Sequence, residues 1–303
     1  MPAVIFDLDG TLVESTELHA DTFVDAFREF GYDVEREKVK ELIGISGIEI
    51  VERITGKPRQ EIFKRKVELF LERIHELKER KNASRVLKQL RKRGIKVGLA
   101  TSSTREMTEA IVEKFGWKFD CIVTPENVER GKPDPQMLAM AVEKLGGPAV
   151  YVGDTEYDRK MAELCGVDPL ILGENLGDLG EVLSYRFGRV KTHELADREM
   201  VGTPVKVAPG YARVVLLTKE IMKVDESGLV NDSFTFGVAE LAAMLAVNRP
   251  GVLLKSAMVR FLRKVHVGDV IVGEGWFEKG RVRVRAIVKG KAVLEGLLEV
   301  HVG

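Results

Sequence analysis

Two aspartates near the N-terminus are the residues of this chain whose type and spacing most directly predict chemistry. Asp7 and Asp9 are separated by one residue and follow the apolar run Ala3–Phe6. Because side chains alternate along a strand, two carboxylates spaced in this way point to the same side. One carboxylate can then act as a nucleophile while the other transfers a proton. The alternative is a strand that ends in an Asp-Gly turn with two solvated carboxylates.

The sequence Asp7-Leu8-Asp9-Gly10-Thr11 after an apolar strand resembles the first motif of the haloacid dehalogenase-like superfamily. The resemblance implies a phosphatase in which Asp7 attacks a phosphoryl group. Asp9 would protonate the leaving oxygen and later deprotonate the water that cleaves the aspartyl phosphate. The dehalogenases of the superfamily lack the second aspartate, so Asp9 favours phosphate ester hydrolysis over cleavage of a carbon–halogen bond.

Three later stretches resemble the remaining motifs of the superfamily. Thr101 resembles the hydroxyl that hydrogen-bonds the phosphoryl group, with a helix N-cap as the alternative. Lys132, within Gly-Lys-Pro, resembles the lysine that neutralises the charge of the nucleophile and the phosphoryl group. The acidic loop that begins at Gly153 resembles the fourth motif and implies bound Mg²⁺. The expected ligands are the carboxylates of Asp7, Asp154 and Asp158 and the backbone carbonyl of Asp9.

These motifs need a scaffold that brings them to one place. Apolar runs alternate with helical stretches, which predicts a doubly wound parallel α/β sheet with the site at the carboxyl ends of its strands. The motifs fall at such ends. The predicted strands are residues 3–6, 95–100, 121–123, 149–152 and 169–172.

A helical insertion of about residues 14–82 separates the first two strands. It resembles the cap domain of the subgroup that contains phosphoglycolate phosphatases and β-phosphoglucomutases. Such a cap would close over the site, exclude water and select the substrate. The predicted helices are 16–30, 35–43, 47–55 and 58–80, followed by 83–93.

Several cap residues bear on the substrate. The mutase grips a distal phosphate with an arginine of a cap loop, and the matching stretch 42–48 has none, which disfavours mutase activity. His19, Arg53 and Lys57 are possible substrate contacts, with solvated helix-face residues as the alternative.

Residues 191–303 show a different pattern, and we expect them to form a second domain after a boundary near Val190. One helix, Phe234–Val247, is apolar on all sides, so we expect other elements to enclose it. A central helix gripped by a curled antiparallel sheet is the α+β hotdog fold. The predicted strands are 211–224, 253–262, 269–277, 282–288 and 291–300.

The stretch from Asn231 through Gly237-Val238-Ala239-Glu240 resembles hotdog thioesterases of the phenylacetyl-CoA type. The resemblance implies that Glu240 is the nucleophile or general base at a thioester carbonyl, although aspartate is commonest there. A structural ion pair is the alternative. Burial of this carboxylate on an apolar helix would cost free energy, which suggests that the carboxylate has a functional role.

Other polar residues near this stretch imply contacts with acyl-CoA. Asn231 would position substrate or water, or only cap the helix. The strand and turn 259–269 also resemble this thioesterase family. Within them, Arg260, Arg263 and Lys264 would hold coenzyme A phosphates, with exposed strand charges as the alternative. A rival resemblance is the acyl-CoA-sensing domain of a malonyl-CoA-responsive repressor, which binds a thioester without hydrolysing it.

The composition excludes several functions. The chain has 303 residues, with 47 basic and 47 acidic side chains, so it has no net charge to attract nucleic acid or an anionic membrane. Two cysteines predict no disulfide framework. A strand that begins at Ala3 leaves no room for a signal peptide, so we expect a cytoplasmic protein. Many lysines and glutamates, with three glutamines and five asparagines, suggest a thermophilic source.

The sequence thus predicts a bifunctional hydrolase. Residues 1–190 would form a Mg²⁺-dependent phosphatase, and residues 191–303 an acyl-CoA thioesterase that assembles a homodimer or homotetramer. The alternative is a phosphatase whose second domain is a non-catalytic acyl-CoA sensor or an oligomerisation module.

Overall fold

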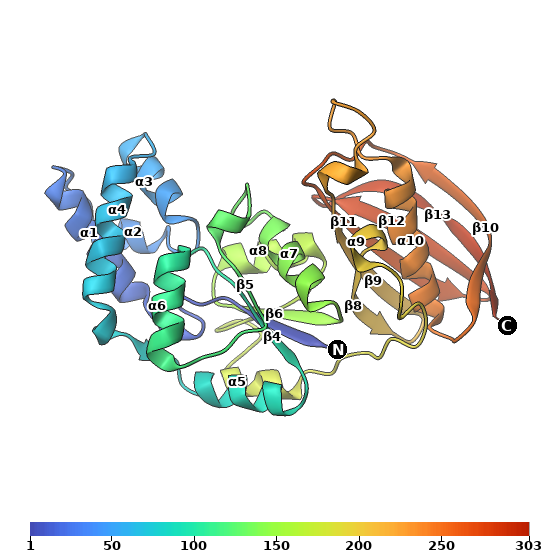
Figure 1. Cartoon of the computed structure of the whole chain (residues 1–303), viewed down its shortest axis with the longest axis horizontal. Helices are drawn as coiled ribbons and strands as arrows, with labels where there is room; N and C mark the ends of the chain where they lie inside the picture. Colours follow the sequence, from blue (N-terminus) through green and yellow to red (C-terminus); the bar gives the residue numbers. More distant parts are fainter. Residues whose placement is uncertain (303) are drawn as a thin grey trace.

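The computed structural model describes residues 1–302, which form one parallel and one antiparallel sheet that lie next to each other (Figure 1). The parallel sheet has the strand order β5-β4-β1-β6-β7. Its five parallel strands confirm the predicted α/β class. They are β1 (Ala3–Phe6), β4 (Lys96–Ala100), β5 (Cys121–Val123), β6 (Ala149–Gly153) and β7 (Asp168–Ile171).

Helices cover both faces of this sheet. The central strand β1 is buried on both sides, which explains its unbroken apolar sequence. Its successive side chains enter two separate apolar clusters, each shared with a different pair of helices. The first pair is α5 (Ala83–Lys92) and α6 (Arg105–Phe115), and the second is α7 (Gln136–Leu145) and α8 (Glu156–Cys165).

The insertion after β1 is a helical cap with an apolar cluster of its own. The helix predicted over 58–80 is wrong beyond Glu72. There the chain makes a 3₁₀ turn and then forms β3 (Lys78–Glu79), which pairs with β2 (Val13–Glu14) in a separate two-stranded antiparallel sheet. The cap helices are α1 (Thr16–Glu29), α2 (Arg36–Lys40), α3 (Gly47–Thr55) and α4 (Gln60–Glu72).

The antiparallel sheet has the strand order β10-β13-β12-β11-β9-β8, and α10 (Asp232–Val247) contacts all six strands. Close approach of α10 to β11 depends on two glycines. A Cβ on Gly273 would lie 2.7 Å from Val238, and one on Gly275 would lie 2.6 Å from the carbonyl of Ala242. The strands are β8 (Thr203–Ala208), β9 (Tyr211–Leu217), β10 (Val252–Phe261), β11 (Val270–Glu278), β12 (Arg281–Val288) and β13 (Lys291–Val302).

Three details of this second part differ from the sequence prediction. Strand β8 was not predicted. Strand β9 ends at Leu217, because the chain then turns into a short 3₁₀ segment. Helix α10 is enclosed as expected along residues 241–246, which are all buried, but its N-terminal half is only partly covered and leaves Phe236 and Glu240 half-buried. The remaining short elements are 3₁₀ turns at Ile74–Glu76, Pro125–Asn127, Leu179–Ser184 and Glu220–Met222, and α9 (Arg198–Val201).

The two sheets are joined by an apolar cluster. Side chains of β8, β9 and β11 pack with α7 and α8, on the face of the antiparallel sheet opposite α10. Polar contacts border this cluster. Lys219 Nζ lies 2.7 Å from Glu143 Oε1, and the Arg130 guanidinium donates to the carbonyl of Gly268 at 2.7 Å. The antiparallel sheet therefore covers the two helices that follow the Lys132 and Asp154 loops.

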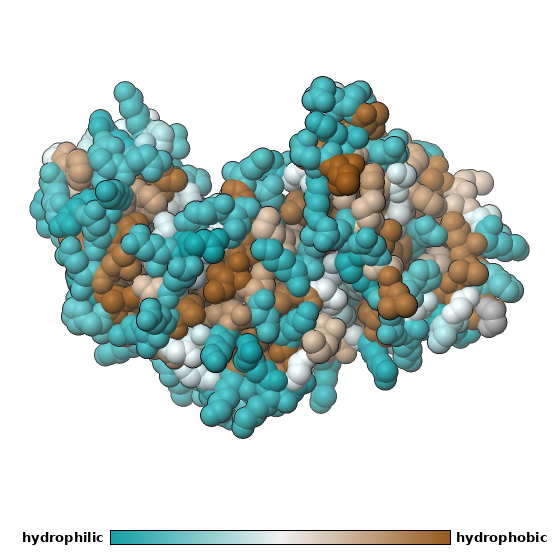
Figure 2. Space-filling view, viewed as in Figure 1, coloured by the Kyte–Doolittle hydropathy of each residue, from teal (hydrophilic) through white to brown (hydrophobic). Residues whose placement is uncertain are grey.

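The surface is mainly polar, but apolar side chains gather over the antiparallel sheet. Figure 2 shows brown and tan residues among the teal over α10 and toward β10. On β10 itself, Leu253 is 61% exposed, Met258 80% and Phe261 45%. Within residues 1–302, no helix combines the length and the apolar character that crossing a membrane requires.

Candidate active site

The loops after β1, β4 and β6 converge at the carboxyl edge of the parallel sheet. Lys132, from the loop before α7, donates from Nζ to Asp7 Oδ1 at 2.5 Å and to Asp158 Oδ1 at 2.8 Å. All three side chains are at least nine-tenths buried. Burial lowers the pKa of the Lys132 ammonium, but Asp158 and Asp7 outweigh it and raise that pKa above its ordinary value. A permanent positive charge is thus fixed beside the Asp7 carboxylate.

Three carboxylates surround this lysine. Oxygens of Asp7, Asp154 and Asp158 all lie within 4.8 Å of one another. Burial, followed by the charge of Asp158, raises the pKa of Asp154 to about 6. Burial also raises the pKa of Asp7 well above its ordinary value, with Lys132 opposing. One ammonium does not balance three carboxylates, and hard oxygen donors in excess negative charge fit a divalent cation such as Mg²⁺.

Short local contacts hold these carboxylates in place. The Thr11 hydroxyl donates to Asp154 Oδ1 at 2.7 Å, and the Tyr151 hydroxyl donates to Asp158 Oδ1 at 2.7 Å. Gly10 has a φ of +78°, and a Cβ there would lie 2.1 Å from Asp154 Oδ2. Glycine is therefore required at this position both for its backbone angle and for the space beside Asp154.

The Asp9 carboxylate points away from the other three and is held by hydroxyl and imidazole donors. It accepts from Ser103 Oγ at 2.5 Å, from Ser15 Oγ at 2.7 Å and from His19 Nε2 at 2.8 Å. Burial acts to raise the pKa of Asp9, but His19, Ser103 and Ser15 outweigh it and hold that pKa well below its ordinary value. In this arrangement Asp9 is ionised, which is the form that accepts a proton.

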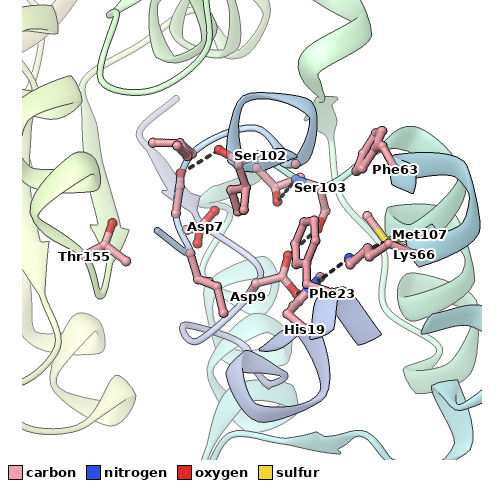
Figure 3. Close-up of a pocket in the computed structure, with 16 residues that line it drawn as sticks. Asp7, Asp9, His19, Phe23, Phe63, Lys66, Ser102, Ser103, Met107 and Thr155 are labelled. Carbon is pink, nitrogen blue, oxygen red and sulfur yellow. Dashed lines mark hydrogen bonds and ion pairs between the residues drawn. The ribbon is translucent and has the colours of Figure 1, made fainter. Parts of the chain in front are cut away.

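A buried lysine of the cap extends this network (Figure 3). Since His19 donates its Nε2 proton to Asp9, its Nδ1 is an acceptor, and Lys66 Nζ lies 2.7 Å from it. Lys66 is 1% exposed and packs over the rings of Phe23 and Phe70. Burial lowers the pKa of Lys66 to about 7. The chain Lys66–His19–Asp9 therefore links helices α4 and α1 of the cap to the loop that follows β1.

Thr101 completes the set predicted for this edge of the sheet. It is fully buried, its Oγ1 accepts from the backbone N–H of Ser103 at 3.1 Å, and it lines the cavity that contains Asp7 and Asp9. Its hydroxyl proton remains available to an oxygen bound in that cavity.

Comparison with known proteins decides the family. A model described as "Haloacid dehalogenase-like hydrolase" matches residues 4–171, which is more than half of the chain. The chain belongs to the haloacid dehalogenase-like hydrolases.

Relatives of this hydrolase match shares of the chain that differ in size. The putative pyrophosphatase PpaX of Clostridium perfringens is 34% identical over 201 residues, which are 58% of this chain and 88% of that protein. The methylthioribose-1-phosphate isomerase of Aquifex aeolicus is 46% identical over 112 residues, which are 35% of this chain. The chain spans only 25% of that relative's length. Among solved structures, CbbY from Rhodobacter sphaeroides in complex with phosphate is 26% identical, with a TM-score of 0.53 over 58% of this chain and 88% of that chain.

Sequence reasoning missed several residues of this hydrolase site. Ser15 and Ser103 bind Asp9, and Tyr151 binds Asp158, but serine and tyrosine are too common for their presence alone to signal a role. Lys66 carried a usable signal, because it occupies the buried face of α4 between Ile62 and Phe70 at four-residue spacing. His19, expected to contact substrate or solvent, is buried, lines the cavity and hydrogen-bonds Asp9. Arg53 pairs with Glu49 at 2.7 Å and does not line the cavity, and Lys57 is exposed.

The predicted residues of the second domain do not converge within one chain. Asn231 caps α10 by accepting from the Ser233 N–H at 3.0 Å. Glu240 is half-buried and makes no hydrogen bond or ion pair with residues 1–302. The expected burial of this carboxylate is therefore wrong, because that side of α10 is uncovered.

The predicted arginines lie elsewhere. Arg260 lines a hollow with Trp276 and Arg283. Gly275 faces α10, so the next residue, Trp276, lies on the opposite face of the sheet, and Arg260 lies there with it. Arg263 and Lys264 are exposed in the turn after β10. The reason is alternation along the strands, which separates Arg260 from Glu240 by the thickness of the sheet.

Proposed function

We propose that residues 1–190 are a Mg²⁺-dependent phosphate monoester phosphatase that works through an aspartyl phosphate. The observation that carries the proposal is the buried Asp7 carboxylate, 2.5 Å from Lys132 and grouped with Asp154 and Asp158. Mg²⁺, held by these three carboxylates, would neutralise charge on the phosphoryl group. Side chains of the protein carry out the bond-forming and proton-transfer steps of the mechanism.

In the first step an Asp7 oxygen forms a bond to phosphorus as the bond from phosphorus to the ester oxygen breaks. Thr101 and Lys132 hold the phosphoryl oxygens. Asp9, which is ionised at rest, first takes up the proton of the monoprotonated phosphate ester and then gives it to the leaving oxygen. In the second step Asp9, now ionised, takes a proton from water, which attacks phosphorus and releases phosphate and Asp7. Contacts with His19, Ser15 and Ser103 favour the ionised form of Asp9 and so support the second step.

The test is phosphate release from compounds suggested by the relatives, namely pyrophosphate and methylthioribose 1-phosphate, together with 4-nitrophenyl phosphate. We expect Asp7→Asn to abolish release, because the amide cannot form the aspartyl phosphate. The exposed Asp33→Asn, which touches no catalytic group, is the control. Activity retained in Asp7→Asn would remove Asp7 from the mechanism.

We further propose that residues 191–303 form a hotdog domain with acyl-CoA thioesterase activity and that the domains meet near Val190. No helix or strand lies between Ser184 and Arg198, which supports this boundary. The sheet against α10 and the half-buried, unpaired Glu240 in the middle of that helix support a thioester site. The helix N-terminus would polarise the carbonyl. Glu240 would be its nucleophile or general base.

The test is thiol release from short-chain, long-chain and aromatic acyl-CoAs. We expect release that Glu240→Gln removes and that Glu278→Gln, on an exposed strand end, leaves intact. Binding of acyl-CoA without thiol release would instead favour the second candidate, an acyl-CoA sensor, which the unpaired position of Glu240 also fits.

A further inference from the structure

The cavity over the catalytic aspartates has one polar and one apolar side. Its enclosed volume is about 40 Å³. The sheet edge supplies Asp7, Asp9, Thr101 and neighbouring hydroxyls. The opposite side, where the group attached to a bound phosphoryl must lie, is lined almost wholly by hydrocarbon and one thioether. Its apolar residues are Phe23, Ile43, Ile45, Ile50, Phe63 and Met107.

The basic side chains at this cavity already have hydrogen-bond or ion-pair partners. Within residues 1–302, the basic side chains that line it are His19 and Lys66. Lys66 Nζ lies against His19 Nδ1, and His19 donates to Asp9, so both serve the acid–base group. Lys132 is bound to Asp7 and Asp158. A second anionic group on the substrate would therefore be buried against isoleucine and phenylalanine without a partner, which is costly.

The cap loop around Gly44 holds this apolar side against the sheet edge that carries the catalytic residues. Ser102 Oγ, at the sheet edge, donates to the carbonyl of Gly44 at 2.8 Å. Gly44 has a φ of +122°, and a Cβ there would lie 3.0 Å from the Tyr157 ring. A Cβ on Gly47 would lie 2.2 Å from the Phe63 ring. The loop backbone thus fits closely between α8 and α4 and brings Ile43 and Ile45 over the cavity.

We propose that the substrate is a phosphate monoester whose leaving group is uncharged and largely apolar, and that Ile43, Ile45 and Phe63 select it. The proposal rests on the phosphatase function proposed above. It disfavours pyrophosphate, bisphosphates and phosphorylated carboxylic acids as substrates, because each places a second anion on the apolar side.

The first test compares two esters of equal length, n-butyl phosphate and 3-carboxypropyl phosphate. We expect kcat/KM for the butyl ester to be higher by at least about 10-fold, since burying an unpaired charge costs more than losing a methylene contact. Equal values, or preference for the carboxylated ester, would overturn the proposal. The competitive inhibition constants of butylphosphonate and 3-carboxypropylphosphonate should show the same order without any substitution.

The second test introduces a cation on the apolar side. Ile43→Arg should reduce the preference for the butyl ester by about 10-fold, because the guanidinium can pair with the carboxylate. The matched control is Ile48→Arg, since Ile48 is similarly half-buried in the same segment but does not line the cavity. Its preference should equal that of the wild type. An unchanged preference in a folded Ile43→Arg protein would show that this side does not select the leaving group.

These outcomes separate the two proposals. Hydrolysis of 4-nitrophenyl phosphate by the wild type, with no preference between the butyl and carboxypropyl esters, would leave the phosphatase and remove the specificity. No hydrolysis of any ester in the presence of Mg²⁺ would remove the phosphatase function itself.

Discussion

At the scale of residues, the site combines two buried lysines in opposite electrostatic situations. Lys132 lies between two carboxylates, which raise its pKa and keep it charged. Lys66 has aromatic rings and a histidine as neighbours, so burial dominates and lowers its pKa to about 7. The first lysine supplies a fixed charge, whereas the charge of the second changes within the range of pH at which enzymes work.

This difference gives a prediction for stability against pH. The pKa of Lys66 is about 7 in the folded chain and about 10.4 when unfolded. Between these values the unfolded chain binds a proton that the folded chain does not, so the contribution of Lys66 to stability rises with pH across this window. The rise is at most about 5 kcal/mol.

The measurement is the free energy of unfolding of the wild type and of Lys66→Met from pH 7 to pH 10. The wild type should gain stability relative to the variant as pH rises. Lys64→Met, an exposed lysine on the same helix, is the control and should follow the wild type. Parallel curves for Lys66→Met and the wild type would show that Lys66 keeps an ordinary pKa.

At the scale of elements, the loop that carries Lys132 is fixed at both ends. Gln136 Oε1, at the start of α7, accepts from the backbone N–H groups of residues 129 and 130 at 2.8 and 3.1 Å. The Arg130 guanidinium donates to Asp134 Oδ2 and to the carbonyl of Gly268, each at 2.7 Å. Gly268 lies in the turn before β11, so the antiparallel sheet contributes to the position of the Lys132 loop.

We predict that Arg130→Met lowers kcat for phosphate release roughly 10- to 100-fold, because small displacements of a catalytic group are costly. Lys219→Met breaks the ion pair with Glu143 across the same interface without touching the loop, and it should leave kcat unchanged. The measurement is steady-state kinetics of both variants. Full activity in Arg130→Met would mean that the loop holds its position without the antiparallel sheet.

At the scale of the whole molecule, one edge of the antiparallel sheet is open. Strand β10 pairs with β13, and within residues 1–302 no strand pairs with its other edge. Its ten residues expose Leu253, Met258 and Phe261. A long apolar edge favours pairing with another strand, and a second copy of the same strand closes it most simply.

We therefore predict a homodimer through β10. Sedimentation should give twice the mass of one chain, and the double substitution Leu253→Lys and Met258→Lys should give monomers, because like charges would face each other at the edge. Ile221→Lys, at a residue 78% exposed in the turn after β9, should remain dimeric. A monomeric wild type at micromolar concentration would contradict the prediction.

The sequence by itself determined the sheet that holds the phosphatase motifs. Apolar runs and helical periods are local properties, so the parallel strands and the cap helices followed from them. Both predicted aspartates line one cavity, although β1 ends before them at Phe6. The same local rules failed where a segment changes direction, as after Glu72, because formation of β3 depends on the β2 partner and not on helix propensity.

Tertiary structure alone decided which residues meet. Lys66 and His19 are 47 positions apart, and Ser103 is 94 positions from Asp9, so no local pattern joins them to one proton-transfer group. The apolar side of the cavity is formed by three cap helices and a loop. That this side has no unpaired cation becomes evident only once these elements are packed together. The packing of β8, β9 and β11 on α7 and α8 likewise depends on two surfaces that are far apart in the chain. The sequence contained these surfaces, but only the fold showed that they face each other.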